Sequence, residues 1–261
     1  MARIVAVANQ KGGVGKTTTS VNVSASLAQA GKRVLLVDLD PQGNATMGCG
    51  IDKRKVTRTV YHVLLGLGDI ATIRVASESG GYDLVPSNRD LAGAEIELVD
   101  LPNREGRLRS ALERLAADYE FVLIDCPPSL SLLTVNAFAA ADEVLIPMQC
   151  EYYALEGLSD LVGTIKRVRA NINPRLQIAG LLRTMYDPRN TLSHQVSQQL
   201  EEHFGEKVYR TLVPRNVRLA EAPSFGAPAV VWDRTSKGAQ AYLALTDEIL
   251  ARAGVLDGNT A

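Results

Sequence analysis

The chain has 261 residues, 46% of them hydrophobic, and a formal net charge of −1. This composition suits one large buried core and excludes a low-complexity chain. The longest apolar runs are strand-length, so we expect neither a transmembrane helix nor a signal peptide ahead of the first strand. Three cysteines without a C-x-x-C pair exclude a disulfide scaffold and predict a reducing cytoplasm. We expect one domain over residues 1–253 and a short flexible tail over 254–261.

A glycine-rich segment near the N-terminus follows an apolar run at Ile4–Ala8, which is typical of a buried strand. The segment Gln10–Thr19 reads QKGGVGKTTT, and Ser20–Gln29 has the pattern of a helix packed on a sheet. A strand, a glycine-rich turn and a helix in this order form the context of a phosphate-binding loop. A plain glycine-rich turn with solvated lysines is the alternative, and this context disfavours it.

The residue types of this loop suit a nucleotide. Its glycines let successive backbone N–H groups point at a phosphate chain, and the helix N-terminus adds further donors. Lys16 is then expected to reach the β- and γ-phosphates, and the Thr17 hydroxyl to ligate Mg²⁺. The predicted contacts with the nucleotide are Lys11, Gly12, Gly13, Val14, Gly15, Lys16, Thr17 and Thr18.

Acidic residues follow two further apolar runs. Arg33–Val37 is a predicted strand that leads to Asp38 and Asp40, and Phe121–Asp125 is a predicted strand that ends in an acid. Ligands of open α/β sheets lie beyond the carboxyl ends of the strands, so these acids should face the nucleotide. Asp125 is expected to bind a water of the Mg²⁺ shell. Because Pro41 turns the chain, only one of the two earlier acids needs to face Mg²⁺, and the other caps a turn.

The remaining pattern alternates strands and helices and predicts a doubly wound, mostly parallel sheet flanked by helices, as in P-loop NTPases. Before residue 121 the pattern predicts elements without chemistry: a short strand end at Asp83–Pro86 and helices at Thr57–Leu65, Arg89–Leu98 and Arg104–Ala117. Further strands and helices are predicted at Ser131–Ala140, Glu143–Pro147, Leu155–Ala170, Leu176–Leu182, Thr191–Phe204, Val208–Leu212 and Ser236–Ala253.

Charge is unevenly distributed along the chain. Between Leu161 and Lys237 there are twelve Lys or Arg residues against six Asp or Glu, a local balance of +6, so the remainder carries −7. This part of the chain is therefore a candidate for binding a polyanion, and a solvated charged surface is the alternative.

Several motifs resemble the ParA/MinD group of ATPases. Residues 11–17 read KGGVGKT, whereas the general loop pattern would need a glycine where Gln10 stands. The stretches DLDPQGN at 38–44, DCPPS at 125–129 and PRNVRLAEAP at 214–223 match the same group, and the resemblance runs from Ile4 to about Ala253. The resemblance implies ATP and Mg²⁺ as ligands, and no [NT]-K-x-D guanine reader is present.

The resemblance also implies roles for single residues. Lys11 would reach across a homodimer to the partner's nucleotide, and Asp40 would orient the attacking water while lying near Mg²⁺. Glu151 matches an acid that faces the nucleotide or the partner's lysine. Pro214 and Asn216 would line the adenine, where an amide suits the base edge and Met185 packs on its face.

Among the functions found in this group, the sequence favours that of a chromosome or plasmid partition ATPase of the ParA/Soj type. Such proteins bind non-specific double-stranded DNA as ATP dimers, associate with the nucleoid, and are released when a ParB-type partner stimulates hydrolysis. The arginines implied as DNA contacts are Arg189 and Arg218, with Arg215 and Arg183 as helpers, although each could instead form a surface salt bridge. The alternatives are a MinD-like cell-division ATPase, disfavoured by the expected C-terminal tail, and a metabolic ATPase or amide ligase.

Overall fold

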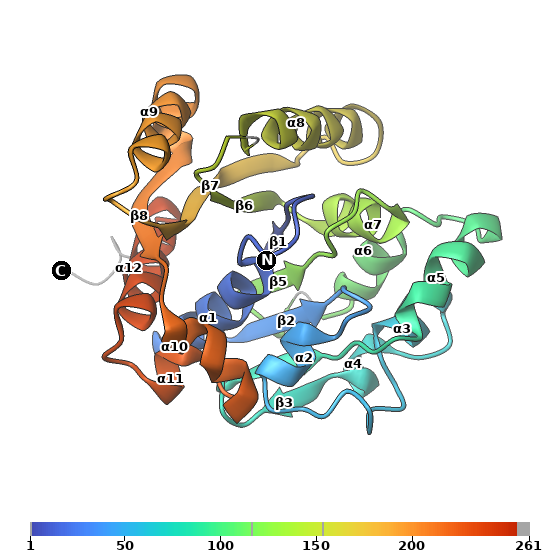
Figure 1. Cartoon of the computed structure of the whole chain (residues 1–261). Helices are drawn as coiled ribbons and strands as arrows, with labels where there is room; N and C mark the ends of the chain where they lie inside the picture. Colours follow the sequence, from blue (N-terminus) through green and yellow to red (C-terminus); the bar gives the residue numbers. More distant parts are fainter. Residues whose placement is uncertain (1, 116, 153, 255–261) are drawn as a thin grey trace.

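A computed structural model describes residues 2–115, 117–152 and 154–254. Within these residues one eight-stranded sheet has the order β3-β4-β2-β5-β1-β6-β7-β8 (Figure 1). All neighbouring strands are parallel except the edge pair β3 and β4. The strands are β1 Arg3–Val7, β2 Val34–Asp38, β3 Val75–Ser77, β4 Tyr82–Val85, β5 Phe121–Asp125, β6 Glu143–Gln149, β7 Gln177–Tyr186 and β8 Val208–Pro214.

The helices lie on both faces of the sheet, as Figure 1 shows. The α-helices are α1 Lys16–Gln29, α2 Asn44–Gly48, α3 Val60–Leu65, α4 Ile70–Ile73, α5 Leu91–Glu97, α6 Arg107–Leu112, α7 Leu132–Ala140, α8 Ala154–Asn171, α9 Thr191–Phe204, α10 Val217–Glu221, α11 Ala229–Trp232 and α12 Lys237–Arg252. Short 3₁₀ helices are η1 Leu98–Asp100, η2 Gly205–Lys207 and η3 Ala222–Phe225. The doubly wound, mostly parallel α/β fold expected from the sequence is thereby confirmed.

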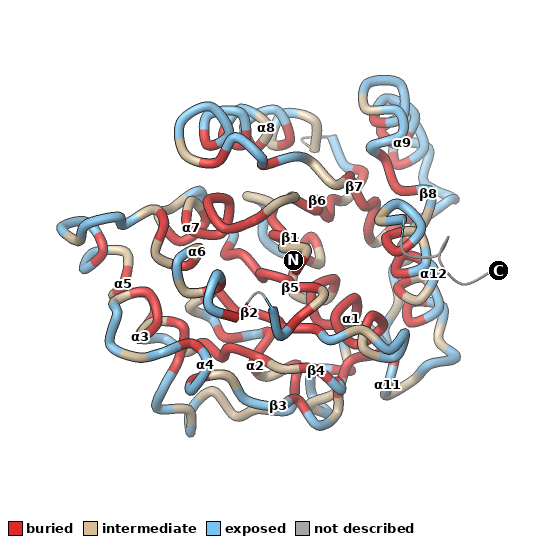
Figure 2. Tube along the Cα trace, turned by 180° about the vertical axis from the view of Figure 1, so that it is seen from behind, coloured by how far each residue is buried: buried red, intermediate tan, exposed pale blue. Residues whose placement is uncertain are grey.

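The strands are apolar throughout because both faces of the sheet are covered. In β2, Leu35 and Val37 join a core with α3, α6, α7 and α8, whereas Val34 and Leu36 join a second core with α1 and α12. The burial map in Figure 2 shows the strands as the buried centre, with exposed residues along the outer sides of the helices. Two cores thus hold the central strands rigidly, and with them the loops at the strand ends.

Several boundaries differ from the sequence-based expectation. The edge strand β3 and the helices α2, α4, α10 and α11 are each five residues or shorter and were not predicted. The helix predicted over Arg104–Ala117 spans only Arg107–Leu112. Of the predicted tail, only Gly254 lies among the described residues. No helix in the described ranges combines the length and apolarity needed to cross a bilayer.

Candidate nucleotide-binding site

The glycine-rich loop lies between β1 and α1, at the carboxyl edge of the sheet and next to its central strands. Gly13 and Gly15 have φ angles of 73° and 89°, a region that side chains with a Cβ rarely adopt. Gly15 is the N-cap of α1, so the loop leads directly into a helix N-terminus with unpaired N–H groups. This geometry suits an anion held by backbone donors.

Two side chains from neighbouring strands fix the backbone of the loop, and neither was predicted. The Thr184 hydroxyl of β7 donates to the Val14 carbonyl oxygen at 2.8 Å, and the Gln149 amide of β6 donates to the Gly13 oxygen at 3.3 Å. Both sit at the carboxyl ends of strands, where any polar residue is a candidate. Sequence reasoning passed over them because no loop motif includes them.

Lys16 and Thr17 face the acid at the end of β5. The Thr17 hydroxyl donates to Asp125 Oδ2 at 2.8 Å, and Ser20, one helical turn on, donates to Asp125 Oδ1 at 2.9 Å. Lys16 is 7% exposed, and its Nζ donates to the Lys11 carbonyl oxygen at 3.1 Å. The structure therefore brings the predicted Lys16, Thr17 and Asp125 together, and adds Ser20 as a further contact of the acid.

Charges at this edge are not balanced by the chain itself. Asp125 and Asp38 are adjacent in register on β5 and β2, and both are fully buried. Burial raises the pKa of Asp125, and the negative charge of Asp38 raises it further. Burial lowers the pKa of Lys16, although the charges of Asp125 and Asp40 act in the opposite direction. A cation bound here would favour the ionised carboxylates.

The two acids at the end of β2, Asp38 and Asp40, have different surroundings. Asp38 accepts hydrogen bonds from the Asp40 N–H at 3.2 Å and from the N–H and hydroxyl of Thr46 at 2.8 and 2.7 Å. The prediction that one of these acids caps a turn is thus confirmed for Asp38. Asp40 is 7% exposed and accepts one hydrogen bond, from the Gln42 N–H to Oδ1 at 2.8 Å. Its Oδ2 has no hydrogen bond to the described residues.

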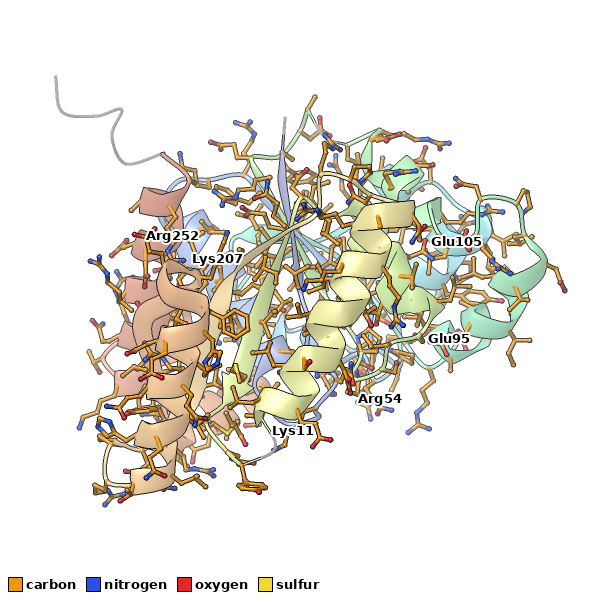
Figure 3. All side chains as sticks on the ribbon, turned by 90° about the horizontal axis from the view of Figure 1, so that it is seen from above. Lys11, Arg54, Glu95, Glu105, Lys207 and Arg252 are labelled. Carbon is orange, nitrogen blue, oxygen red and sulfur yellow. The ribbon has the colours of Figure 1, made fainter. Side chains whose placement is uncertain are left out.

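The additional lysine of the loop points away from the buried acids. Lys11 forms an ion pair with Glu151, which precedes α8, and both side chains are about half exposed. Figure 3 shows Lys11 beside the end of α8, at the surface of the molecule. The structure thus pairs the two residues within one chain, and both remain accessible to a second molecule.

The predicted adenine contacts lie at the ends of β7 and β8. Tyr186 and Pro214 are partners in the parallel register, and Met185 directly precedes Tyr186 on β7. Met185 has a φ of 49°, an uncommon conformation for a bulky residue. Asn216 caps α10 through its oxygen, which accepts from the Arg218 N–H at 2.9 Å, so its amide nitrogen is left to meet a base. These positions suit the edge of a flat ring.

Arg183 does not lie where a DNA contact would need it. It is 5% exposed, and its guanidinium donates to the Ser197 hydroxyl and the Tyr209 carbonyl oxygen, each at 2.7 Å. It also forms an ion pair with Glu201 of α9. Arg183 therefore joins α9 to β7 and β8 in the interior, and we remove it from the set of predicted DNA contacts.

The other three arginines of that set are exposed. Arg189 pairs with Asp187 at 2.9 Å, and its side chain is 86% exposed. Arg218 pairs with Glu221 and Asp233 and lies over the Trp232 ring at 5.6 Å. Hydrogen bonds from Arg189 lower the pKa of Asp187, and the charge of the exposed Arg215 lowers it further. Both arginines therefore lie near one acid.

The donor set suits Mg²⁺ that arrives with a nucleotide. Mg²⁺ takes oxygen ligands and keeps several waters, and it is commonly held by one or two protein groups together with phosphates. The Thr17 hydroxyl is held by Asp125, and Asp40 has a free carboxylate oxygen nearby. Among the described residues, no group of three or more His, Cys, Asp or Glu side chains forms a metal cage. Phosphate oxygens would therefore complete the ion's shell.

The chain is similar to known proteins over most of its length. A family model for AAA domains matches residues 2–178. The chain is 53% identical to the chromosome partitioning protein ParA of Caulobacter vibrioides over 252 residues, covering 96% of this chain and 94% of that protein. It is also 53% identical to the sporulation initiation inhibitor protein Soj of Bacillus subtilis over 251 residues, covering 96% and 99%.

A solved structure shows the same fold with nucleotide bound. Cobyrinic acid a,c-diamide synthase from Mycobacterium smegmatis, with a bound ATP analogue and magnesium, matches with a TM-score of 0.86 and 40% identity. The match covers 97% of this chain and 96% of that one. Together with the loop and the acids at the carboxyl edge, these matches show that the chain belongs to the ParA/Soj family of partition ATPases.

Proposed function

We propose that the chain partitions chromosomes or plasmids by an ATP-driven cycle of dimerisation, DNA binding and release. The observation that carries this proposal is the pair of lysines in one loop. Lys16 lies inside beside the Mg²⁺-binding groups, whereas Lys11 lies at the surface and is free to exchange its partner Glu151. One lysine serves the chain's own nucleotide, and the other is placed to serve a second copy.

Hydrolysis would follow from the groups at the carboxyl edge. The loop N–H groups and Lys16 would hold the phosphates, and Thr17 would supply an oxygen to Mg²⁺. When bound, this ion would neutralise charge on the transferring phosphoryl group. Asp40 uses the oxygen without a hydrogen-bond partner to orient the attacking water. Asp125, which accepts a hydrogen bond from Thr17, would bind a water that Mg²⁺ brings. Met185, Pro214 and Asn216 hold the adenine.

Dimerisation would place Lys11 against the nucleotide of the partner. Lys11 would leave Glu151 and meet the phosphates across the interface, which makes ATP part of the contact between two copies. A cation supplied in this way stabilises the charge that develops during phosphoryl transfer. ADP lacks the γ-phosphate, so the dimer would separate after hydrolysis.

DNA binding would come from arginines gathered by the dimer. Arg189, Arg215 and Arg218 are exposed, and doubling them in a dimer supplies the positive patch that the net charge of −1 does not. To contact phosphates, two of these arginines would have to break some of the ion pairs that they now form with Asp187, Glu221 and Asp233. Contacts of this kind do not read sequence, so binding would extend over the nucleoid. A ParB-type partner would stimulate hydrolysis and cause release.

Co-sedimentation with double-stranded DNA tests the proposal. The chain should sediment with DNA in the presence of Mg²⁺ and ATP, but not with ADP or without nucleotide. Lys16→Ala serves as the control, since it should fail in all three conditions. DNA binding of equal strength in all three conditions, or no DNA binding with ATP at low salt, would contradict the proposal. An amide ligase would then be the next candidate, since the similar Mycobacterium smegmatis protein is named as a diamide synthase.

A further inference from the structure

The main chain of Asp40 is held on both sides by buried side chains. Its N–H donates to Asp38 Oδ1 at 3.2 Å, and its carbonyl oxygen accepts from the Ser87 hydroxyl at 2.8 Å. Ser87 follows β4 and lies 47 positions along the chain from Asp40. The segment after β4 was expected to carry no chemistry, yet it contacts the residue proposed to orient the water.

Thr46 closes these contacts into a ring. Its hydroxyl donates to Asp38 Oδ2 at 2.7 Å and accepts from the Ser87 N–H at 2.9 Å. A hydroxyl has one hydrogen to donate and lone pairs to accept with, so both bonds form together. Asp38, Thr46 and Ser87 are all 0% exposed. Water therefore does not compete for these bonds, and breaking one leaves a buried polar group without a partner.

The loop packs so closely on Ser87 that it has little freedom to shift. A Cβ on Gly43 would lie 2.8 Å from the Ser87 carbonyl oxygen, which is closer than real Cβ contacts come. Gly43 also has a φ of 59°, which favours glycine. The chain from Asp40 to Gly43 is thus fixed against Ser87 by packing and by hydrogen bonds.

We propose that Ser87 and Thr46 are positioning residues for hydrolysis, which hold the Asp40 carboxylate at the attacking water. The proposal rests on the role of Asp40 stated above. Both oxygens of Asp38 are occupied by hydrogen bonds, and Asp40 Oδ1 is occupied by the Gln42 N–H. Among the oxygens of these two acids, Asp40 Oδ2 alone has no hydrogen bond to the described residues, and rotation of the Asp40 main chain would swing it away from a water. Small misplacements of such groups lower rates strongly.

Single-turnover hydrolysis of saturating Mg²⁺-ATP by the full chain tests the proposal. Ser87→Ala removes the bond to Asp40, and Thr46→Val removes a hydroxyl at nearly constant shape, whereas Thr46→Ser keeps that hydroxyl. Ser77→Ala is a matched control, because Ser77 is 2% exposed and its hydroxyl donates to a backbone oxygen, that of Cys49, at 3.1 Å. ATP affinity and thermal stability are measured for each variant.

We expect Ser87→Ala and Thr46→Val to slow hydrolysis by about threefold to tenfold, as loss of one buried hydrogen bond permits. Their ATP affinity should stay unchanged, and Thr46→Ser and Ser77→Ala should keep the parental rate. Parental rates in Ser87→Ala and Thr46→Val would overturn the proposal, as would an equal slowing in Ser77→Ala.

The Asp40→Ala background separates positioning from a general loss of order. If Ser87 acts through Asp40, Ser87→Ala should cause no further slowing in Asp40→Ala. A further slowing by the same factor would show that Ser87 acts independently, and the proposal would fall. If Asp40→Ala alone kept the parental rate, the role of Asp40 itself would fall. A slow Asp40→Ala beside a normal Ser87→Ala would remove only the positioning role.

Discussion

The two edges of the central sheet differ in how they treat charge. At the amino edge, charged groups neutralise one another: Arg3 pairs with Glu143 at 2.7 Å, and Arg252 pairs with Glu248 at 2.8 Å. Burial would raise the pKa of Glu248, but hydrogen bonds from Arg210 and Thr211 outweigh it and lower that pKa. Figure 3 shows Arg252 and Lys207 on the side of the molecule opposite Lys11.

The carboxyl edge holds two buried aspartates side by side and one buried lysine. Burial raises the pKa values of both Asp38 and Asp125. The negative charge of Asp38 raises the pKa of Asp125 further, and the charge of Asp40 adds to the increase at Asp38. Of two edges built by the same strands, one pairs its charges internally, whereas the other holds buried carboxylates that an added cation would keep ionised. The difference identifies the functional edge, since perturbed carboxylates gather where a protein binds ions or performs chemistry.

We expect the largest effect on ATP binding from Lys16, the buried lysine of the carboxyl edge. Lys16→Ala should abolish ATP binding and leave the fold intact, because Lys16 acts as a point charge on phosphate. Lys32, just after the other end of α1, pairs with Glu120 at the amino edge and provides the control. Titration calorimetry should find no ATP binding in Lys16→Ala and parental affinity in Lys32→Ala. Equal affinity in both variants would remove Lys16 from the site.

A second prediction concerns the exposed lysine of the same edge. Lys11→Ala should bind ATP as a monomer, because the phosphate that it serves belongs to the other copy. A cation supplied by a partner is worth roughly 10³–10⁵ in rate in comparable phosphoryl transfers. Light scattering with ATP would measure the mass of the particle. A dimer of normal stability in Lys11→Ala would refute the role across the interface.

Asp40→Ala should slow hydrolysis by about 10²–10⁴-fold while ATP binding and dimerisation persist. The reason is that Asp40 has a carboxylate oxygen free for water, whereas Asp38 does not. Steady-state release of phosphate gives the rate. If the variant turned over ATP normally, water would be oriented by another group.

The smallest effect is expected in DNA binding, far from the buried acids. If Arg189 and Arg218 of each protomer contact one phosphate each, the dimer makes four contacts, and log K against log salt has a slope of about −3.6. Arg189→Ala should reduce the slope to about −1.8 with ATPase activity unchanged. The buried Arg183 is a poor control because its loss would disturb the fold. An unchanged slope would show that Arg189 does not contact a DNA phosphate.

The sequence was most informative where burial on both faces makes a continuous apolar run. Phe121–Asp125 was predicted with the bounds that β5 has, and the acid at its end meets Thr17 as a site residue should. Short elements such as β3 and α11 contain too few residues for a hydrophobic period to repeat, so the sequence pattern could not reveal them.

Contacts between distant segments were beyond prediction from the sequence. Arg183 is in the interior because Ser197 and Glu201 of α9 come to meet it, and no local pattern announces those partners. Ser87 and Thr184 likewise act on loops 47 and 170 positions away. Motifs therefore identified the groups that we expect to meet the nucleotide, whereas the residues that hold these groups in place emerged from the fold.

The carboxyl edge should also bind more protons in the folded chain than in the unfolded chain. In the folded chain without nucleotide, the raised pKa values of Asp38 and Asp125 keep protons bound above about pH 4, where an unfolded aspartate loses them. The folded state then binds more protons than the unfolded state, so its free energy of unfolding falls as pH rises through this window. One excess proton gives a slope of about 1.4 kcal/mol per pH unit.

Denaturant unfolding between pH 5 and pH 8 measures this slope most directly, with and without Mg²⁺ and a non-hydrolysable ATP analogue. We predict that stability without nucleotide declines with pH, and that the decline shrinks in Asp125→Asn. Bound Mg²⁺ and analogue should abolish it, because the cation stabilises the ionised carboxylates. The same decline in Asp125→Asn, or a decline that nucleotide and Mg²⁺ leave unchanged, would contradict the claim that the carboxyl edge is completed by a cation.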